Sequence, residues 1–459
     1  MRQPRWKLIV AVTVRWTILA VIGWLLYALA RALWAIIELK LPFYDWQWYL
    51  ALILLLLGIA AQMAWPLPIV RLKLALGIGL LVWLIVGYNG GSNVMRLNPA
   101  AEPPVKISFW ASVAFEQAPD SLFQDMQAAG GRLYLCCVGP KTFAPENRGV
   151  FLAKLARFAA HKIEVYLVPE VSDFLSVRVH EEWINTVQQV AAALQAENTT
   201  TVRGLIGDAE HPLNMPLDIL ELERGKFYQT QEDLRKVIQR HQQTYPHMAL
   251  GVTAHWSQYL DGLDGDADLA AVQRSPVDPP GTWDFVNVMT YASYFPASWR
   301  AYHVYSIEQA MSQWYGSKSP SYSIGLVGGG FPWEPLLGFD DLVRDARLSR
   351  AVGIREVVVF QLDGALNVFG ADFIRRFTAA VNSDQPDDVV AVAFSRPASM
   401  LLYGTLVADA LLDVLGRGGI VLAGWALLCG VILRQGRKSG GRASRPLRVE
   451  RMPARITRK

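Results

Sequence analysis

Cysteine and histidine are scarce in this sequence: its 459 residues include 3 Cys and 7 His. Cys136 and Cys137 are adjacent in an apparent strand, where neighbouring side chains face opposite sides, and Cys429 lies in an apolar run. Their spacing supports neither a disulfide framework nor a metal site, and the histidines show no ligand pattern. We therefore expect no metal and no cofactor.

Charged residues are also few. Asp, Glu, Lys and Arg make up 18% of the chain and apolar residues 52%, which is too apolar for an ordinary soluble enzyme. The excess lies near the two ends, in four runs close to the ~20 residues that a bilayer span requires. These runs, predicted to be transmembrane helices, are Trp16–Ile37, Trp48–Trp65, Ile69–Tyr88 and Gly418–Leu433.

The basic residues indicate how such helices would be oriented. The first fifteen residues carry four Lys or Arg and no acid, and residues 434–459 carry ten against the single Glu450, which leaves the body of the chain at about −9. By the positive-inside rule both ends are cytoplasmic and the acidic middle is extracytoplasmic, with Arg71 and Lys73 in a cytoplasmic loop. We expect an inner-membrane location and, because nucleic acids require a basic face, no nucleic-acid partner.

One further apolar stretch, Ala398–Leu415, carries Asp409 and Asp413. A span here would place the basic tail outside, so an interfacial helix is preferred, although a span stays open. The predicted organisation is three transmembrane helices in 1–97, an extracytoplasmic domain in 98–385, the interfacial and fourth transmembrane helices in 386–433, and a cytoplasmic tail in 434–459.

The middle domain alternates strand-like and helical patterns eight times. This rhythm over ~280 residues predicts a (β/α)8 TIM barrel, an α/β fold flanked here by transmembrane helices. The expected strands are Val105–Ala111, Arg132–Val138, Ile163–Pro169, Val202–Gly207, Met248–Ala254, Trp283–Thr290, Tyr322–Val327 and Glu356–Leu362. Trp256–Gly281 is expected to be a long loop.

The fourth expected strand ends on two carboxylates, Asp208 and Glu210. Because strand side chains alternate, both should face the same way, at the end of the barrel where chemistry is placed. Paired carboxylates suit acid–base work on glycosidic bonds, although a strand end with solvated acids fits the same segment.

The other strand ends and loops also supply acids and aromatics. They are Glu170, Trp256, Tyr291, Asp363 and, in the loop after the seventh strand, Trp333 and Glu334. With Tyr294 and Phe360, this set is typical of a carbohydrate site, since a phosphate site would favour Lys or Arg after a glycine-rich turn. Each aromatic taken singly is more often a packing residue than a ligand contact.

Three strand ends resemble family-18 glycoside hydrolases, the chitinase-like group. Asp208-Ala-Glu210 is similar to the last half of their D-x-x-D-x-D-x-E motif, and Met289-Thr-Tyr291 to the start of M-x-Y-D. Their eighth strand runs into an aromatic and an acid, as do Phe360 and Asp363. The two earlier acids of the first motif fall on Arg203 and Ile206, the acid after the tyrosine is Ala292, and the third-strand glycine signature is absent, so the chain would be a divergent relative.

The resemblance implies a role for each residue. Glu210 would be the general acid, Asp208 would orient the 2-acetamido group of the substrate, and Tyr291 would hydrogen-bond that group. It implies a glycan substrate in the cell envelope and retaining hydrolysis. The predicted transmembrane helices add an expectation of the lipid bilayer and of membrane-protein partners. Two alternatives stay open: a retaining glycosidase that uses Glu210 and Glu334, and a silent barrel that binds a glycan or a partner.

Overall fold

The computed structural model describes most of residues 94–406 and a few positions between 17 and 30. The gaps within 94–406 are 113–114, 116–117, 173–174, 210–223, 262–269, 272, 274, 277–281, 316–320, 326, 328–335, 386–388, 396–397, 400 and 403. Within these described ranges no helix is long and apolar enough to cross a membrane. The four expected transmembrane helices and the basic tail lie wholly or largely outside the described residues.

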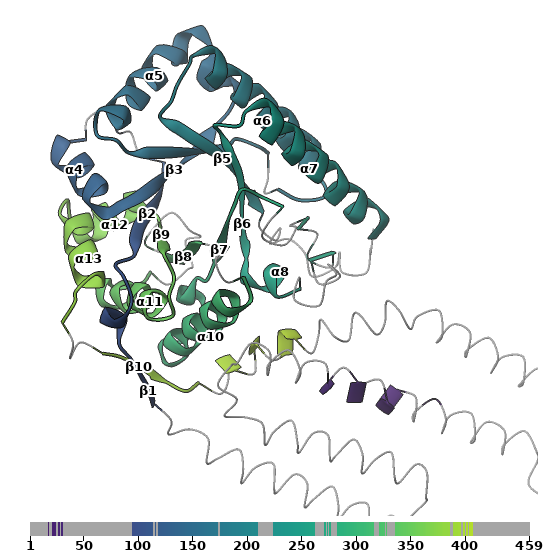
Figure 1. Ribbon diagram of the computed structural model, residues 1–459, viewed down its shortest axis with the longest axis vertical. Helices are drawn as coiled ribbons and strands as arrows, with labels where there is room; N and C mark the ends of the chain where they lie inside the picture. Colours follow the sequence, from purple (N-terminus) through teal and green to yellow (C-terminus); the bar gives the residue numbers. More distant parts are fainter. Residues whose placement is uncertain are drawn as a thin grey trace, which may run out of the picture.

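Eight parallel strands form a closed barrel, as predicted (Figure 1). Each strand pairs with the next along the chain, and the eighth pairs with the first, for example Val357 with Ile107. The strands are β2 (Lys106–Ala111), β3 (Gly130–Val138), β4 (Glu164–Pro169), β5 (Val202–Ala209), β6 (Ala249–His255), β7 (Phe285–Met289), β8 (Ser321–Gly325) and β9 (Glu356–Phe360).

Helices surround the barrel (Figure 1). They are α4 (Asp120–Ala129), α5 (Pro145–Ala160), α6 (His180–Ala196), α7 (Arg224–Thr244), α8 (Trp256–Asp261), α10 (Ala297–Tyr315), α11 (Phe339–Ala351), α12 (Leu362–Phe369) and α13 (Phe373–Val381). Helix α4 illustrates how an amphipathic sequence packs on the barrel: one of its faces is buried, through Leu122, Phe123, Met126 and Ala129. It ends at Gly130, whose φ of +69° suits glycine.

Strand side chains are buried on both faces of the barrel wall. Outward side chains such as Leu133 and Leu135 pack with the helices in the main core. Inward ones form a second cluster that includes Trp110, Tyr134, Tyr166, Ile206 and Val358. These aromatic rings fill the barrel interior, as in other barrels of this size.

Two short strands outside the barrel were not expected. β1 (Val94–Leu97) pairs antiparallel with β10 (Val390–Ala393), with Val94 opposite Ala393 and Leu97 opposite Val390. The expected domain limits at 97 and 385 exclude both strands. Inside this two-stranded sheet, Val390 and Val392 pack with residues of α10 and α11 in a separate apolar cluster.

Arg350, at the end of α11, ties the two chain ends of the barrel together. Its side chain is buried and donates hydrogen bonds to the backbone carbonyl oxygens of Glu102, Pro103, Val381 and Ser383. It also lies 2.6 Å from the carboxylate of Asp384. One guanidinium therefore joins the segment that enters the barrel to the segment that leaves it.

The expected loop at Trp256–Gly281 begins instead with the short helix α8. The expected interfacial segment Ala398–Leu415 is helical at the positions described up to Leu406. Ala398, Leu402 and Leu406 are buried there. The rest of that segment, with Asp409 and Asp413, lies outside the described residues.

Candidate functional site

The C-terminal ends of the barrel strands and the segments that follow them are called the mouth here. Asp208 is the second-to-last residue of β5. It lies two positions after the inward-facing Ile206, so its side chain also points toward the barrel axis. Its backbone carbonyl oxygen accepts a hydrogen bond from Leu175 N at 2.7 Å. The side chain itself is half-buried, but its Oδ1 is sealed from solvent without a partner among the described residues.

Burial raises the pKa of Asp208 from 3.8 to about 7. Desolvation is the cause, because it disfavours the charged carboxylate. A carboxyl group with such a pKa exchanges a proton near neutral pH, which is a property required for acid–base catalysis. Glu210 follows two residues later, outside the described residues, so its pairing with Asp208 stays a prediction.

Tyr291 lies just past the end of β7, and its ring approaches a residue at the end of β9. Its ring centroid is 5.7 Å from that of Phe360, at the end of β9, and 6.5 Å from that of Tyr294. Gly325 ends β8 between them with φ of +153°, and a Cβ there would collide with the carbonyl oxygen of Phe360. The structure thus brings Tyr291 and Phe360 together at the mouth, with Tyr294 exposed beside them.

Asp363 was expected at the end of the eighth strand but lies in the first turn of α12. Its Oδ2 accepts hydrogen bonds from the backbone N of Ser112 at 2.8 Å and from the Ser112 hydroxyl at 2.7 Å. Its Oδ1 is buried without a partner among the described residues. Asp363 therefore joins the end of β9 to the end of β2, and Ser112 is a mouth residue that sequence reasoning missed.

The sequence analysis also missed a series of hydrogen-bonded polar side chains inside the barrel. Asn287 Oδ1 accepts hydrogen bonds from the hydroxyls of Thr253 at 2.8 Å and Ser323 at 2.6 Å. The hydroxyl of Ser323 in turn lies 3.3 Å from Trp110 Nε1, which donates to it. Thr253 pairs in register with Asp208, so this chain runs across the barrel at the level of that carboxylate. Polar residues at inward positions of otherwise apolar strands were the available signal.

Other predicted site residues have different surroundings. Trp256, expected as a stacking surface for a ligand, is instead buried in the main core, where its ring centroid lies 5.6 Å from that of His303. Glu170 follows β4 and is exposed. Trp333 and Glu334 lie outside the described residues, so the Glu210–Glu334 alternative stays open.

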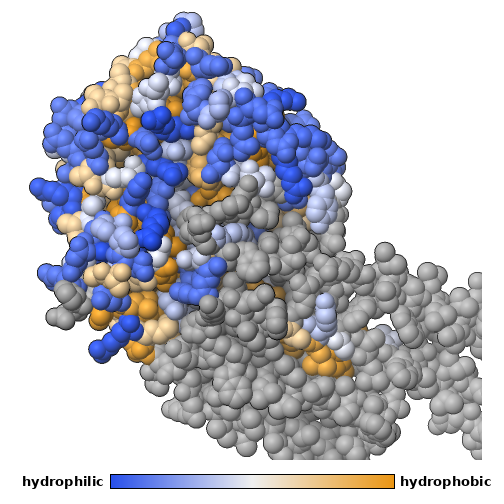
Figure 2. All heavy atoms as spheres, in the orientation of Figure 1, coloured by the Kyte–Doolittle hydropathy of each residue, from blue (hydrophilic) through white to orange (hydrophobic). Residues whose placement is uncertain are grey.

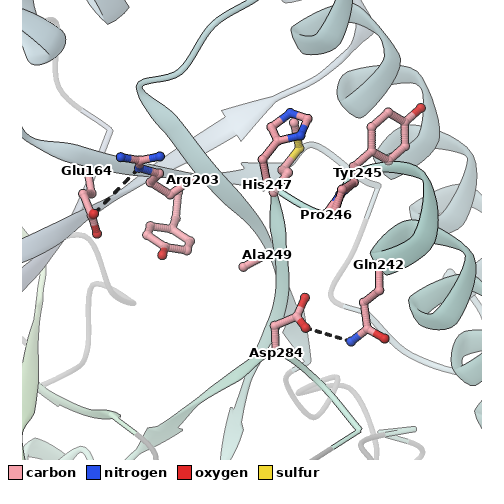
Figure 3. Close-up of a pocket in the computed structure, with 10 residues that line it drawn as sticks. Glu164, Arg203, Gln242, Tyr245, Pro246, His247, Ala249 and Asp284 are labelled. Atoms are coloured by element: carbon pink, nitrogen blue, oxygen red, sulfur yellow. Dashed lines mark hydrogen bonds and ion pairs between the residues drawn. The ribbon is translucent and has the colours of Figure 1, made fainter.

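A pocket of about 520 Å³ lies at the opposite end of the barrel, among the segments that lead into β5, β6 and β7 (Figure 3). None of the predicted site residues lines it. Its polar groups contact one another: Arg203 lies 3.7 Å from Glu164, and Gln242 donates to Asp284 at 2.7 Å. These groups stabilise each other, and the pocket is not our candidate for catalysis.

The part of the chain that the structure describes contains no group of three or more His, Cys, Asp or Glu side chains able to hold a metal ion. The mouth residues described above, Asp208, Tyr291, Phe360, Asp363 and Ser112, make up the candidate site, and Glu210 is expected beside them. It offers a carboxyl group that titrates near neutrality and an aromatic wall. These groups suit a sugar ring better than a phosphate.

Comparison with known proteins gives likenesses of structure only. No family model matches the chain, and no curated protein matches its sequence. Among solved structures, the chain is similar to the glycoside hydrolase domain of PgaB (BpsB) from Bordetella bronchiseptica, at 11% identity over 62% of this chain and 99% of that one, with a TM-score of 0.38.

It is also similar to a GH18 chitinase from Pseudoalteromonas aurantia, at 11% identity over 60% and 99% of the two chains, with a TM-score of 0.41. A GH5-4 broad-specificity endoglucanase from an uncultured bacterium matches at 11% identity over 62% and 95%, also with a TM-score of 0.41. The neighbours are glycoside hydrolases, and similarity at this level assigns the chain to no single family.

Proposed function

We propose that the chain is a membrane-anchored glycoside hydrolase that cleaves β-linked, N-acetylated sugars of an extracytoplasmic polysaccharide. The observation that carries the proposal is the state of Asp208: an inward-facing carboxyl group at the mouth, with a buried Oδ1 that has no partner among the described residues and a pKa raised to about 7. A buried carboxyl group without a partner is costly unless a ligand or a neighbouring group satisfies it.

In this proposal Glu210 protonates the glycosidic oxygen as general acid. Asp208 accepts a hydrogen bond from the N–H of the substrate's 2-acetamido group, whose carbonyl oxygen bonds to the anomeric carbon as the glycosidic bond breaks. A water molecule then opens the cyclic oxazolinium intermediate and restores the starting anomeric configuration. The phenol of Tyr291 donates to that group from across the mouth. Phe360, which contacts Tyr291, supplies the apolar face on which a sugar ring packs.

The membrane anchor is a proposal from hydropathy and charge alone. Four apolar runs of near-spanning length flank the barrel, and both ends of the chain are basic. This topology puts the barrel outside the cytoplasm, where a glycan is the expected substrate. Reporter fusions after Arg96 and at Lys459 should report opposite sides of the membrane, and a common side for both would contradict the four-span topology.

The test of activity compares hydrolysis of an N-acetylated β-linked tetrasaccharide with that of its deacetylated form. Only the acetylated glycan should be cleaved, and Glu210→Gln should lower the rate by about 10²–10⁴-fold. Glu232→Gln is the matched control, because Glu232 is an exposed acid in the middle of the outer helix α7, away from the mouth. Equal cleavage of both glycans would contradict the role of the acetamido group and favour the Glu210–Glu334 pair.

One observation favours a second candidate, the silent glycan-binding barrel. Ile206 and Ala292 occupy two positions where the chitinase-like motifs have acids, and both side chains are buried in apolar clusters. Binding of the acetylated tetrasaccharide without any cleavage would favour the silent glycan-binding barrel over the hydrolase.

A further inference from the structure

The two-stranded sheet outside the barrel determines where both flanking segments leave the domain. Strand β10 begins near the residues that Arg350 joins, at the end of α11, which is the end of the barrel opposite the mouth. It then runs along α10 towards that helix's first turns. There Phe394 packs on Tyr302, with ring centroids 5.0 Å apart.

The first turns of α10 lie at the mouth, since α10 follows β7 and Tyr291. Ala292, next to Tyr291, belongs to the same apolar cluster as Phe394 and Ala398. The chain beyond β10 therefore leaves the barrel beside the candidate site. Because β1 is antiparallel to β10 and Val94 lies opposite Ala393, β1 begins at the same place (Figure 1).

The exposed large hydrophobic side chains fit this geometry. Tyr294 and Leu336 lie in segments that follow barrel strands, at the mouth, and are 46% and 52% exposed. Val94, at the mouth end of the two-stranded sheet, is 56% exposed. Of the other exposed large hydrophobics among the described residues of the barrel domain, Val150, Tyr228 and Val368 lie on helices, and Val389 precedes β10 at the opposite end.

The opposite end of the barrel is polar. Many of the exposed or half-buried residues that precede barrel strands there are polar, among them His161, Lys162, Asn198, Thr200, His247 and Arg355, although Tyr245 and Val352 are half-buried there too. On the side of the barrel, the visible surface over the outer helices α6 and α7 is largely hydrophilic (Figure 2). The mouth thus carries exposed apolar side chains, and the first residue of β1 and the last residue of β10 lie on that side of the two-stranded sheet.

We propose that the mouth of the barrel faces the membrane surface and receives a glycan that a lipid holds at that surface. This inference rests on the proposed glycan hydrolysis and on the predicted spans. Exposed aromatic and aliphatic side chains partition into the headgroup region. Two attachment points on one side hold the mouth there. A lipid-held glycan is then confined with the site, whereas a soluble glycan must diffuse into the gap between barrel and bilayer.

The orientation is tested with the full chain in vesicles of phosphatidylethanolamine and phosphatidylglycerol that include a lipid with a nitroxide on its headgroup. A genetically encoded fluorescent amino acid replaces Leu336 in one protein and Thr200 in another; both side chains are exposed, at opposite ends of the barrel. The nitroxide should quench the fluorophore at position 336 and leave that at position 200 unquenched. Equal quenching, or quenching at position 200 alone, overturns the orientation.

The substrate class is tested in the same vesicles, without the nitroxide, with an N-acetylated β-linked tetrasaccharide that either carries a hexadecyl chain at its reducing end or does not. Confinement raises the effective concentration, so kcat/KM should favour the lipid-linked form roughly tenfold or more. Equal kcat/KM, or preference for the soluble form, overturns the lipid-held substrate. If neither form is cleaved, the proposed hydrolase is refuted, and the quenching measurement still decides the orientation.

Discussion

Replacing Asp208 by Asn should change how the stability of the protein depends on pH. The folded-state pKa of Asp208 is raised from 3.8 to about 7 by burial. Below about pH 4 the carboxyl group is neutral in both folded and unfolded chains, so it costs nothing. As the pH rises from about 4 to about 7, the unfolded chain releases its proton first, and the folded state loses stability through this window.

A shift of about 3 pKa units corresponds to an upper limit of roughly 4 kcal/mol, at 1.36 kcal/mol per unit. Because the side chain is half-buried, solvent screening reduces this, and we expect about 2 kcal/mol. Asn has the same shape and no charge, and it keeps the backbone contact with Leu175. Asp208→Asn should therefore match the wild type near pH 4 and be more stable by about 2 kcal/mol at pH 8.

Thermal unfolding of the full chain in detergent, followed by Trp fluorescence, measures this difference. For a domain of this size about 2 kcal/mol is a shift of roughly 4 °C. Burial also raises the pKa of Asp345 to about 6 and that of Glu308 well above its usual value, but both acids are present in the two proteins, so their effect cancels. A difference that is constant from pH 4 to pH 8 would refute the desolvated state of Asp208.

Two further substitutions test the packing that positions the site. Arg350→Met removes a buried guanidinium that donates hydrogen bonds to several backbone carbonyl oxygens, so it should lower the free energy of unfolding by about 3 kcal/mol. Arg355→Met removes one side of an exposed ion pair with a 4.0 Å separation and should change that free energy by less than about 0.5 kcal/mol. Equal costs for the two variants would contradict the role of Arg350. Gly204→Ala would place a Cβ against the carbonyl oxygen of Ala249 in β6 and 2.8 Å from the ring of Tyr166, and should destabilise by about 1–3 kcal/mol. Gly149→Ala, in an open position of α5, should stabilise by about 0.5–1 kcal/mol. Chemical unfolding of the four variants measures both pairs, and a neutral Gly204→Ala would contradict the close approach of β5 to Tyr166.

The barrel could be predicted because its strands carry local signals. Apolar runs such as Val357–Val359 alternate with amphipathic segments such as that of α4, whose one-sided apolar pattern ends at a glycine. β1 and β10 could not be predicted. Each has four residues, and they exist as strands through pairing with each other across almost 300 residues.

The candidate site was partly predictable for the same reason. Strand ends locate Asp208 and Tyr291 at the mouth, since the register of a barrel brings such ends together. Asp363 was assigned to a strand end, although the chain turns into α12 after Phe360 and the acid bonds Ser112. Trp256 was interpreted as a stacking surface, but whether an aromatic ring faces a ligand or the core depends on tertiary packing.

The central claim is that the mouth performs acetamido-assisted, retaining hydrolysis. The most direct measurement is proton NMR of the first product released when the full chain cleaves an N-acetylated β-linked tetrasaccharide, with Glu210→Gln as the control. The account predicts that the β-anomer appears first and that the variant forms it at least about 10²-fold more slowly. An α-anomer formed first, or β-anomer formed at the wild-type rate by Glu210→Gln, would contradict it.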